Sequence, residues 1–421
     1  MERMPGSGAV IQGMAGTLSW QRAGLLLPGQ CLLAAGIGAA AWMERDTLAP
    51  LALLLLLPLL VACAAGRRGA FCIAFAYYGS ATRAVPGIIG YFFPSLPLAA
   101  CLALWAAHCA LLALPWALAL APSDAHPGRR VARMLAALVG MSMPPIGLFH
   151  WGSPLMAAGL LYPGWQWAGL VLTAMLLTLL AACQWNSRPF QVALAAACAL
   201  SALANLGHRT PAAPAGWHAV SLAYGKSPGL WSDDMAARRA ALARIALRSL
   251  DTGAKVIIFP ESIAGSSRRP QDGVWRPVAD LARRNGATVL VGEERWNAER
   301  TGFRNALVDY GSLQEGGQVT VSSMVPMPVG DWKFGLEEGA ETNIFGSDLV
   351  VLHGRRVAFS MCYEDFLLWP HRGLLAGRAE LLVSVTNQWP SAGTSAEGAQ
   401  DVSRRALARL AGVPLLTAKN H

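Results

Sequence analysis

The stretch Val357–Asp365, VAFSMCYED, decides how the second half of this 421-residue chain is interpreted. An apolar run leads into Cys362, and the polar pair Tyr363-Glu364 follows at once. This pattern predicts a buried strand that delivers a thiol to the turn at its end. A thiol beside carboxylates is a candidate nucleophile. A free cysteine is as often a small buried hydrophobic residue, so the role of Cys362 depends on the rest of the chain.

The residues that follow the linker Pro211–Gly216 alternate between expected strands and helices. The sequence therefore predicts an α/β sandwich. We expect strands at 218–222, 255–260, 288–294, 303–309, 349–352, 355–362, 381–386 and 413–418, and helices at 233–250, 274–285 and 396–410. Three of these strands end in polar groups, namely Glu261, the Cys362 turn and Asn387-Gln388-Trp389. Because ligand sites of open α/β sheets gather at carboxyl ends of strands, these groups form the candidate site.

The first half of the chain has the composition of a membrane domain. The whole chain is 54% hydrophobic and only 14% charged, against roughly 25% charged residues in soluble domains. Residues 1–207 contain ten arginines, no lysine and four acidic residues. About seven spans are expected, at 23–43, 48–66, 70–94, 97–121, 131–150, 165–183 and 189–207. We therefore place a polytopic helical domain at 1–210 and the α/β domain at 211–421.

The third expected span is the weakest, because Arg83, Pro86 and several glycines interrupt it. It is interpreted as a broken or re-entrant segment. Arg83 itself either snorkels to the membrane surface from a short helix or a loop, or contacts a lipid phosphate or a substrate near that surface. If the N-terminus is cytoplasmic, most loop arginines lie on the inside, as the positive-inside rule requires. Seven spans then place the α/β domain outside the cytoplasm, which in a Gram-negative bacterium is the periplasmic side of the inner membrane.

Cysteine and charge usage narrow the classes of function. Seven of the eight cysteines lie in the apolar half, which leaves Cys362 as the one thiol of the α/β half. No CxxC or Cys/His spacing indicates zinc, so neither a metal nor another cofactor is expected. The net charge of +9 is spread along the chain without a Lys/Arg-rich run. Membrane lipid is therefore an expected partner, and nucleic acid is not.

Four segments resemble the nitrilase (carbon–nitrogen hydrolase) superfamily. They are FPES at 259–262, MCYED at 361–365, VTNQWP at 385–390 and ARLAGVPLLTAKN at 408–420. The polytopic half narrows the resemblance to the membrane-bound branch, which contains apolipoprotein N-acyltransferase and conjugal-transfer proteins of the TraB type. GSPLMAAGLLYPGW at 152–165 also resembles the acyltransferase's loop near the membrane surface. The resemblance implies a nitrilase-like αββα sandwich. The chain stops at His421 without a further span, which is more similar to the TraB type.

The resemblance also implies roles for individual residues. Glu261 would be the general base and Cys362 the nucleophile that forms a thioester acyl-enzyme. The backbone N–H of Tyr363 would help to hold the oxyanion, while Glu364, Asn387 and Trp389 would be accessory or substrate-binding residues.

The superfamily's catalytic lysine has no match at its expected position, which falls near Ser323. The chain has four lysines, at 226, 255, 333 and 419. Lys333 is the best substitute because it lies on the lid-like loop that begins at Met327. A solvated loop lysine is an equally good interpretation of Lys333. Asp331 stands where the superfamily keeps an accessory glutamate.

The function implied by the resemblance is that of a cysteine-dependent, membrane-embedded enzyme of the TraB conjugal-transfer type. Its expected role is maturation of a pilin peptide, with the conjugation machinery as partner. One alternative is an apolipoprotein N-acyltransferase, which moves an acyl chain from phospholipid to a membrane-held lipoprotein. A different alternative is a catalytically inactive assembly module that uses the same fold.

Overall fold

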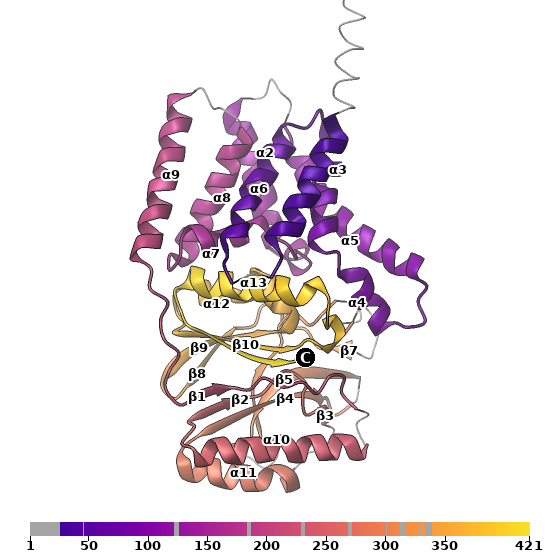
Figure 1. Ribbon diagram of the computed structural model, residues 1–421, viewed down its shortest axis with the longest axis vertical. Coiled ribbons are helices and arrows are strands. Elements are labelled where there is room, and N and C mark those ends of the chain that lie inside the picture. The colour runs from indigo at the N-terminus through magenta and orange to yellow at the C-terminus, as the bar shows by residue number, and fades with distance from the viewer. Residues whose placement is uncertain are drawn as a thin grey trace, which may run out of the picture.

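The computed structural model describes residues 26–44, 46–121, 126–182, 187–228, 232–267, 272–299, 301–311, 317–328, 330–332 and 339–421. Two halves lie one above the other (Figure 1). A bundle of helices forms the upper half, and two sheets with flanking helices form the lower half. The chain crosses once, from the last helix of the bundle into the first strand, so the first half of the sequence forms the helical half and the second half forms the sheets.

The helical half begins with the helix Leu26–Ala41. The following elements are η1 (Ala49–Leu55), α2 (Leu56–Ala62), α3 (Arg67–Ala81), α4 (Val85–Phe92), α5 (Leu98–Ala119), α6 (Pro127–Ser142), η2 (Ile146–Leu148), η3 (Pro154–Ala157), α7 (Ala158–Leu161), α8 (Gln166–Ala182) and α9 (Arg188–Gly207). Among the described helices, α5 and α9 are long and apolar enough to cross a membrane. This is weak support for a membrane domain, and the seven-span arrangement stays a prediction.

Two of the expected spans are not single helices. The span 70–94 is divided between α3 and α4, with a break at residues 82–84. Pro86 lies in the first turn of α4, where a proline's missing N–H costs nothing, so it suits the start of a new helix. The expectation of a broken segment is confirmed. In the expected span 131–150, α6 ends early, at Ser142, just before Pro144-Pro145, which cannot continue a helix, and the short η2 follows.

The lower half contains two sheets. The first has the order β1 (Trp217–Ala219), β2 (Val256–Ile258), β4 (Thr288–Trp296), β5 (Gly302–Asp309) and β6 (Gln318–Ser322), with β3 (Ser266–Ser267) and β7 (Gly339–Ala340) beside it. The second has the order β11 (Leu415–Asn420), β10 (Leu381–Asn387), β9 (Arg355–Met361) and β8 (Leu349–Leu352). Because β2 and β9 each run parallel to a neighbouring strand, the carboxyl ends of strands gather at common edges.

The two sheets pack face to face and are covered by helices on both outer sides. Apolar side chains of both sheets, such as Ile258 and Phe359, share one buried core. A second core joins the first sheet to α10 (Asp233–Asp251) and α11 (Asp272–Asn285). On the other side, α12 (Arg372–Leu375) and α13 (Ser395–Ala411) lie between the second sheet and the helical half (Figure 1). The expected αββα sandwich is confirmed.

Most strands and helices of this half lie close to their expected bounds. Ser232 caps α10, since its side chain accepts a hydrogen bond from the backbone N–H of Met235 at 3.2 Å. The expected turn at His353-Gly354 joins β8 and β9, with both residues at positive φ. The last strand lies two residues later than expected, at Leu415–Asn420, because its ladder with β10 continues to the pair Asn387 and Asn420. Lys419 therefore lies inside β11 and does not follow it.

The two halves meet where α7 packs on α13. A methyl group added to Gly159 would meet the backbone oxygen of Ala406 at only 2.2 Å, so no other residue fits there. Nearby, the backbone N–H of Gly164 donates to the carbonyl of Arg409 at 2.8 Å. The segment 152–165, quoted above for its resemblance to a membrane-surface loop, therefore attaches the helical half to the sandwich.

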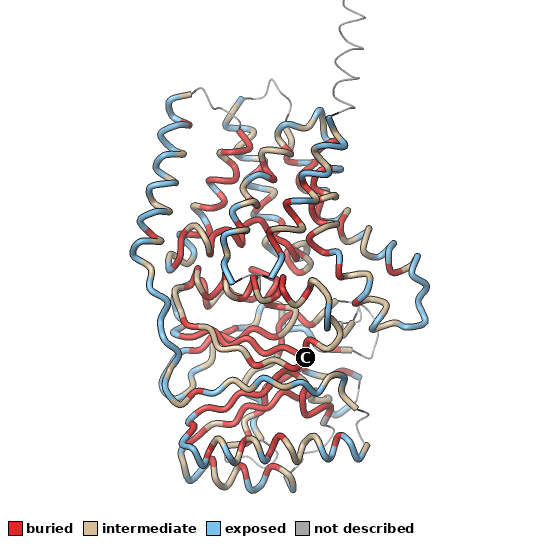
Figure 2. The backbone as a smooth tube through the Cα atoms, in the orientation of Figure 1, coloured by how far each residue is buried: buried red, intermediate tan, exposed pale blue. Residues whose placement is uncertain are grey.

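Burial differs between the halves (Figure 2). The strands of the sandwich are largely buried, whereas α9 is mostly exposed. Large apolar side chains stand out from the helical half, including Leu98, Leu118, Val192, Leu203 and Leu206, each more than half exposed. Exposed apolar surface of this extent is typical of a surface that faces lipid or another protein.

Candidate active site

Cys362 lies where β9 ends and a short 3₁₀ helix, η4 (Cys362–Phe366), begins. Its φ of 48° is in the left-handed region, which a residue with a side chain rarely adopts. Such backbone strain is common at functional sites. The expected strand with a thiol at its end is therefore present.

Two buried carboxylates on η4 hold this turn. Glu364 accepts hydrogen bonds from the hydroxyl of Ser323 and from the backbone N–H groups of Met324, Val325 and Met361. Burial raises the pKa of Glu364 to about 7. Asp365 accepts from Ser360, Ser384 and Gln400, and the same Gln400 amide donates to the carbonyl of Cys362 at 2.8 Å. Through these hydrogen bonds, both carboxylates fix the backbone of the turn and with it the position of the Cys362 thiol.

Glu261 follows β2 and lies against Cys362 across the gap between the two sheets. One carboxylate oxygen accepts from the side chain of Asn305, and the other accepts from the backbone N–H of Asn387 at 3.2 Å. Burial and the nearby charge of Asp331 raise the pKa of Glu261, and a hydrogen bond with Cys362 lowers it, so that the pKa is about 8 in all. The expected base and the expected nucleophile therefore meet.

The thiol of Cys362 is poorly acidic in this environment. Burial raises its pKa well above the usual value, and the charge of Glu261 and the hydrogen bond with it raise the pKa further. A thiol of this kind needs a base that takes its proton as it attacks. Glu261 is in place to be that base, because its raised pKa makes it a better proton acceptor than an ordinary carboxylate.

Gly292 on β4 allows the backbone at Glu261 to come this close. A methyl group at Gly292 would meet the carbonyl of Pro260 at 2.1 Å and the backbone of Glu261 at 2.7 Å. The next residue, Ser262, has φ 46° and donates its hydroxyl to Asn305 at 2.9 Å. Asn305 thereby has its donor directed at Glu261. The sequence pattern predicts a strand around Asn305 but no role for this side chain. Asn305 reaches Glu261 only because β5 pairs with β4, which in turn pairs with β2.

The remaining expected site residues surround this pair. The charge of Asp331 acts on Glu261, on Cys362 and on Glu294 of β4, whose pKa is raised to about 7, mainly by burial. Asp331 therefore lies close to the reacting groups. The hydroxyl of Tyr363 donates to the carbonyl of Leu148 in the helical half at 3.1 Å. The oxyanion role of the Tyr363 backbone N–H stays a prediction.

Trp389 lies farther out, on η6 (Trp389–Ser391), where its ring is 4.7 Å from that of Tyr91 on α4. The Nζ atom of Lys226 is 5.7 Å from the centre of the Trp389 ring. Lys333 lies outside the described residues. Lys255 donates to the carbonyl of Asn285, far from the site, and Lys419 pairs with Asp401.

A cavity of about 330 Å³ leads from Cys362 into the helical half. On the sandwich side it is lined by Met327, Pro328, Cys362, Tyr363, Phe366, Asn387, Pro390, Ser391 and Gln400. On the helical side it is lined by Val85, Ile88, Ile89, Leu104, Ala107, His108, Leu111, Phe149 and Trp151. The lining is mainly apolar, and the volume is at the lower end of the roughly 300–1,000 Å³ of ligand pockets. The helical half, mainly through α4 and α5, thus supplies half of the lining residues.

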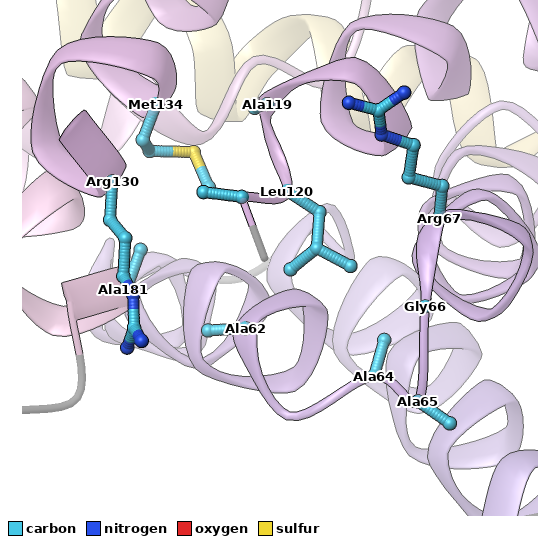
Figure 3. Close-up of a pocket in the computed structure, with 11 residues that line it drawn as sticks. Ala62, Ala64, Ala65, Gly66, Arg67, Ala119, Leu120, Arg130, Met134 and Ala181 are labelled. Atoms are coloured by element: carbon cyan, nitrogen blue, oxygen red, sulfur yellow. The ribbon is translucent and has the colours of Figure 1, made fainter. Parts of the chain in front are cut away.

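A second cavity, of about 370 Å³, lies at the far end of the bundle, where the ends of α2, α5 and α8 meet the starts of α3 and α6. It holds Arg67 and Arg130, but the two guanidinium groups point away from each other (Figure 3). It is therefore a weaker candidate for a substrate site. The cavity does show that two of the arginines on which the orientation prediction rests lie at the same end of the bundle.

Comparisons with known proteins bear on the family of this chain. No model of a known protein family matches the chain. The conjugal transfer protein TraB of Agrobacterium fabrum (strain C58) is 30% identical over 414 residues, which cover 92% of this chain and 91% of that protein. The probable conjugal transfer protein TraB of Sinorhizobium fredii (strain NBRC 101917 / NGR234) is 29% identical over 391 residues, which cover 91% and 95%.

Similar solved structures include a carbon–nitrogen hydrolase from Helicobacter pylori, at 13% identity, with a TM-score of 0.36 over 48% of this chain and 73% of that one. An amidase from Nesterenkonia sp. is 16% identical, with a TM-score of 0.31 over 48% and 74%. At these scores the likeness bears on neither activity nor substrate. The αββα layers with a thiol and a buried carboxylate between the sheets are of the nitrilase-like class. The chain belongs to the TraB family of conjugal transfer proteins.

Proposed function

We propose that this chain is a membrane-embedded enzyme that uses Cys362 for amide or acyl transfer on a substrate of the conjugation machinery. Glu261 takes the thiol proton as sulfur attacks the substrate carbonyl. The leaving amine or alcohol receives that proton when the tetrahedral intermediate collapses to a thioester. A second amine or water then attacks the thioester, gives its proton to Glu261, and the thiolate leaves and is reprotonated.

The observation that carries this proposal is the apolar cavity with Cys362 in its wall. The cavity is lined by apolar residues of α4 and α5 as well as by the turn that carries Cys362. A substrate with a large apolar portion fits such a lining. For a TraB protein, we propose a hydrophobic pilin peptide that is held in the membrane and matured by cleavage or joining of an amide bond.

The cavity also favours a second candidate, lipoprotein N-acylation with phospholipid as acyl donor, because an acyl chain needs the same apolar lining. The sequence disfavours lipoprotein N-acylation, because Ser323 lies near the expected position of the catalytic lysine and donates its hydroxyl to Glu364. Loss of one oxyanion donor costs about 100–1,000-fold in rate. Complementation distinguishes the two candidates. Restored growth of a strain depleted of its own lipoprotein acyltransferase would favour acylation, whereas loss of conjugation on deletion favours the pilin role.

We propose the inner membrane as location, with the sandwich on the periplasmic side. The exposed apolar faces of α5 and α9 and the arginines at the far end of the bundle support this. A reporter active only outside the cytoplasm should be active after His208 and at His421, and silent after Arg68 or Arg130. The reverse pattern would contradict the orientation.

The decisive experiment asks whether Cys362 becomes acylated. Protein purified in detergent and exposed to substrate should gain a mass that neutral hydroxylamine removes, as it does from a thioester. Cys362→Ala should gain none, and the cysteines in apolar segments should react little because their thiols resist ionisation. Full biological function in Cys362→Ala would instead support the inactive assembly module.

Lys333 can be tested in the same assay. If its ammonium completes the oxyanion site, Lys333→Ala should slow acylation by about two orders of magnitude. Lys255→Ala is the control, since Lys255 is bound to Asn285 far from the site. If acylation is as fast in Lys333→Ala as in Lys255→Ala, then Lys333 does not stabilise the oxyanion, and backbone N–H groups do so instead.

A further inference from the structure

The cavity beside Cys362 contains polar side chains, and most of them are already engaged. Tyr363 and Ser391 donate their hydroxyls to backbone carbonyls, Gln400 donates to Cys362 and Asp365, and the amide oxygen of Asn387 accepts from Asn420. Among the described lining residues, two buried side-chain atoms lack a hydrogen-bond partner, Nδ1 of His108 and Nε1 of Trp151. Buried polar atoms of this kind are rare and costly, so they call for a role.

The tautomer of His108 follows from its one hydrogen bond. Nε2 lies 2.8 Å from the carbonyl oxygen of Phe149. A carbonyl only accepts, so Nε2 carries the hydrogen and, in the neutral ring, Nδ1 presents a lone pair. His108 therefore offers a hydrogen-bond acceptor to whatever occupies the cavity.

Trp151 is held beside His108 by the same carbonyl. Its backbone N–H donates to Phe149 at 2.8 Å, and its ring stacks on Phe366 of η4 with 4.1 Å between centres. Its indole N–H is a donor only. The helical half thus places one unused acceptor, on α5, and one unused donor, on the loop packed against the turn that carries Cys362, in the wall of the same cavity.

We propose that His108 and Trp151 form a subsite that binds the backbone of an apolar peptide segment. This inference rests on the proposed function and names its substrate class. A peptide backbone offers both an N–H for His108 and a C=O for Trp151 along its length. An ester-linked acyl chain offers acceptors alone and leaves Nδ1 of His108 unpaired.

The test uses reagents that alkylate Cys362. N-acetyl-tetraleucine chloromethyl ketone is compared with analogues in which an ester oxygen replaces one peptide N–H in turn, and with an alkyl chloromethyl ketone of equal length. The rate of Cys362 alkylation is measured by intact mass on the full chain in detergent, with Cys362→Ala as background. One ester replacement should slow alkylation about tenfold, the typical cost of one buried hydrogen bond.

Two variants locate the effect. Trp151→Phe keeps the stack on Phe366 but removes the N–H, and His108→Leu removes the lone pair. Each should slow the peptide reagent about tenfold and leave the alkyl reagent unchanged, and His108→Gln should restore part of the rate. Trp105→Phe is the matched control, because the Trp105 indole already donates to Thr82 at 3.0 Å and does not line the cavity.

The outcomes separate this inference from the proposed function. Equal rates for peptide, ester and alkyl reagents would overturn the inference, and would mean that a lipid chain or water occupies the subsite. A uniform loss in Trp151→Phe for all reagents would also overturn it. Failure of every reagent to react selectively at Cys362 would contradict the proposed function itself.

Discussion

The two sides of the cavity differ in how their polar groups are used. On the sandwich side, Glu364 accepts four hydrogen bonds from the protein, and Asp365 accepts three. On the helical side, the lining is apolar except for His108, whose Nδ1 is unused, and Trp151, whose indole N–H is unused. Polar groups that are fully hydrogen-bonded within the protein hold the reacting atoms in a fixed geometry. Polar groups without a partner are available to bind the substrate and so select which substrate is bound.

The largest effect should come from the reacting thiol on the sandwich side. Cys362→Ala should abolish acylation, because no other group in the cavity lining is a nucleophile of similar strength. Cys362→Ser should retain the fold with little acylation, since a hydroxyl is a far weaker nucleophile. Intact mass and a thermal unfolding curve check both points. Acylation at an unchanged rate in Cys362→Ala would move the chemistry to another part of the molecule.

The next largest effect concerns Glu261. Glu261→Gln keeps the shape but removes the base, which should slow acylation by about 100–10,000-fold. Because the raised pKa of Glu261 is about 8, the wild-type rate should rise with pH up to about 8 and then level off. Below that pH the carboxyl is protonated and accepts no proton. The rising limb should disappear in Glu261→Gln, and its persistence there would exclude Glu261 as the titrating base.

A smaller effect is expected from filling the helical side. Ala107 lines the cavity, so Ala107→Trp should block its apolar part. Long reagents should bind about 10–100-fold more weakly, while the small reagent iodoacetamide should react with Cys362 at an unchanged rate. Ala103→Trp on the same helix does not face the cavity and serves as the control. Equal losses for long and small reagents would show that the cavity is not the path of the substrate.

The smallest effect concerns the hydrogen bonds that hold Glu364 in the turn after Cys362. Ser323→Ala removes one of the four hydrogen bonds of Glu364, so it should lower the free energy of unfolding by about 1 kcal/mol. Thermal unfolding checks this, with Ser322→Ala as the neighbouring control. Activity should change little, because three backbone N–H groups still hold the carboxylate. A large loss of activity without loss of stability would give Ser323 a direct role in the chemistry.

These differences also explain what the sequence could predict. Cys362 and Glu261 stand at the ends of apolar strands, so their pattern alone placed them near each other. Asn305 was missed, because it reaches Glu261 through pairing of strands that no local pattern specifies. His108 and Trp151 were missed because each is a single polar side chain, one in an apolar helix and the other in a loop, and a single residue forms no repeating pattern in the sequence. The division of the third span was foreseen from Arg83 and Pro86, whereas the early end of α6 was not.

The contact between Gly159 and Ala406 has a consequence for selection of substrates. With two backbones pressed together and no side chain between them, the sandwich cannot slide along the bundle. In a bilayer, the sulfur of Cys362 would therefore stand at one constant height above the lipid head groups. A carbonyl that sits closer to the membrane, or farther from it, would not meet the sulfur whatever its chemistry. With the helical half in the membrane as proposed, the joint between the halves would fix the depth at which a substrate can react.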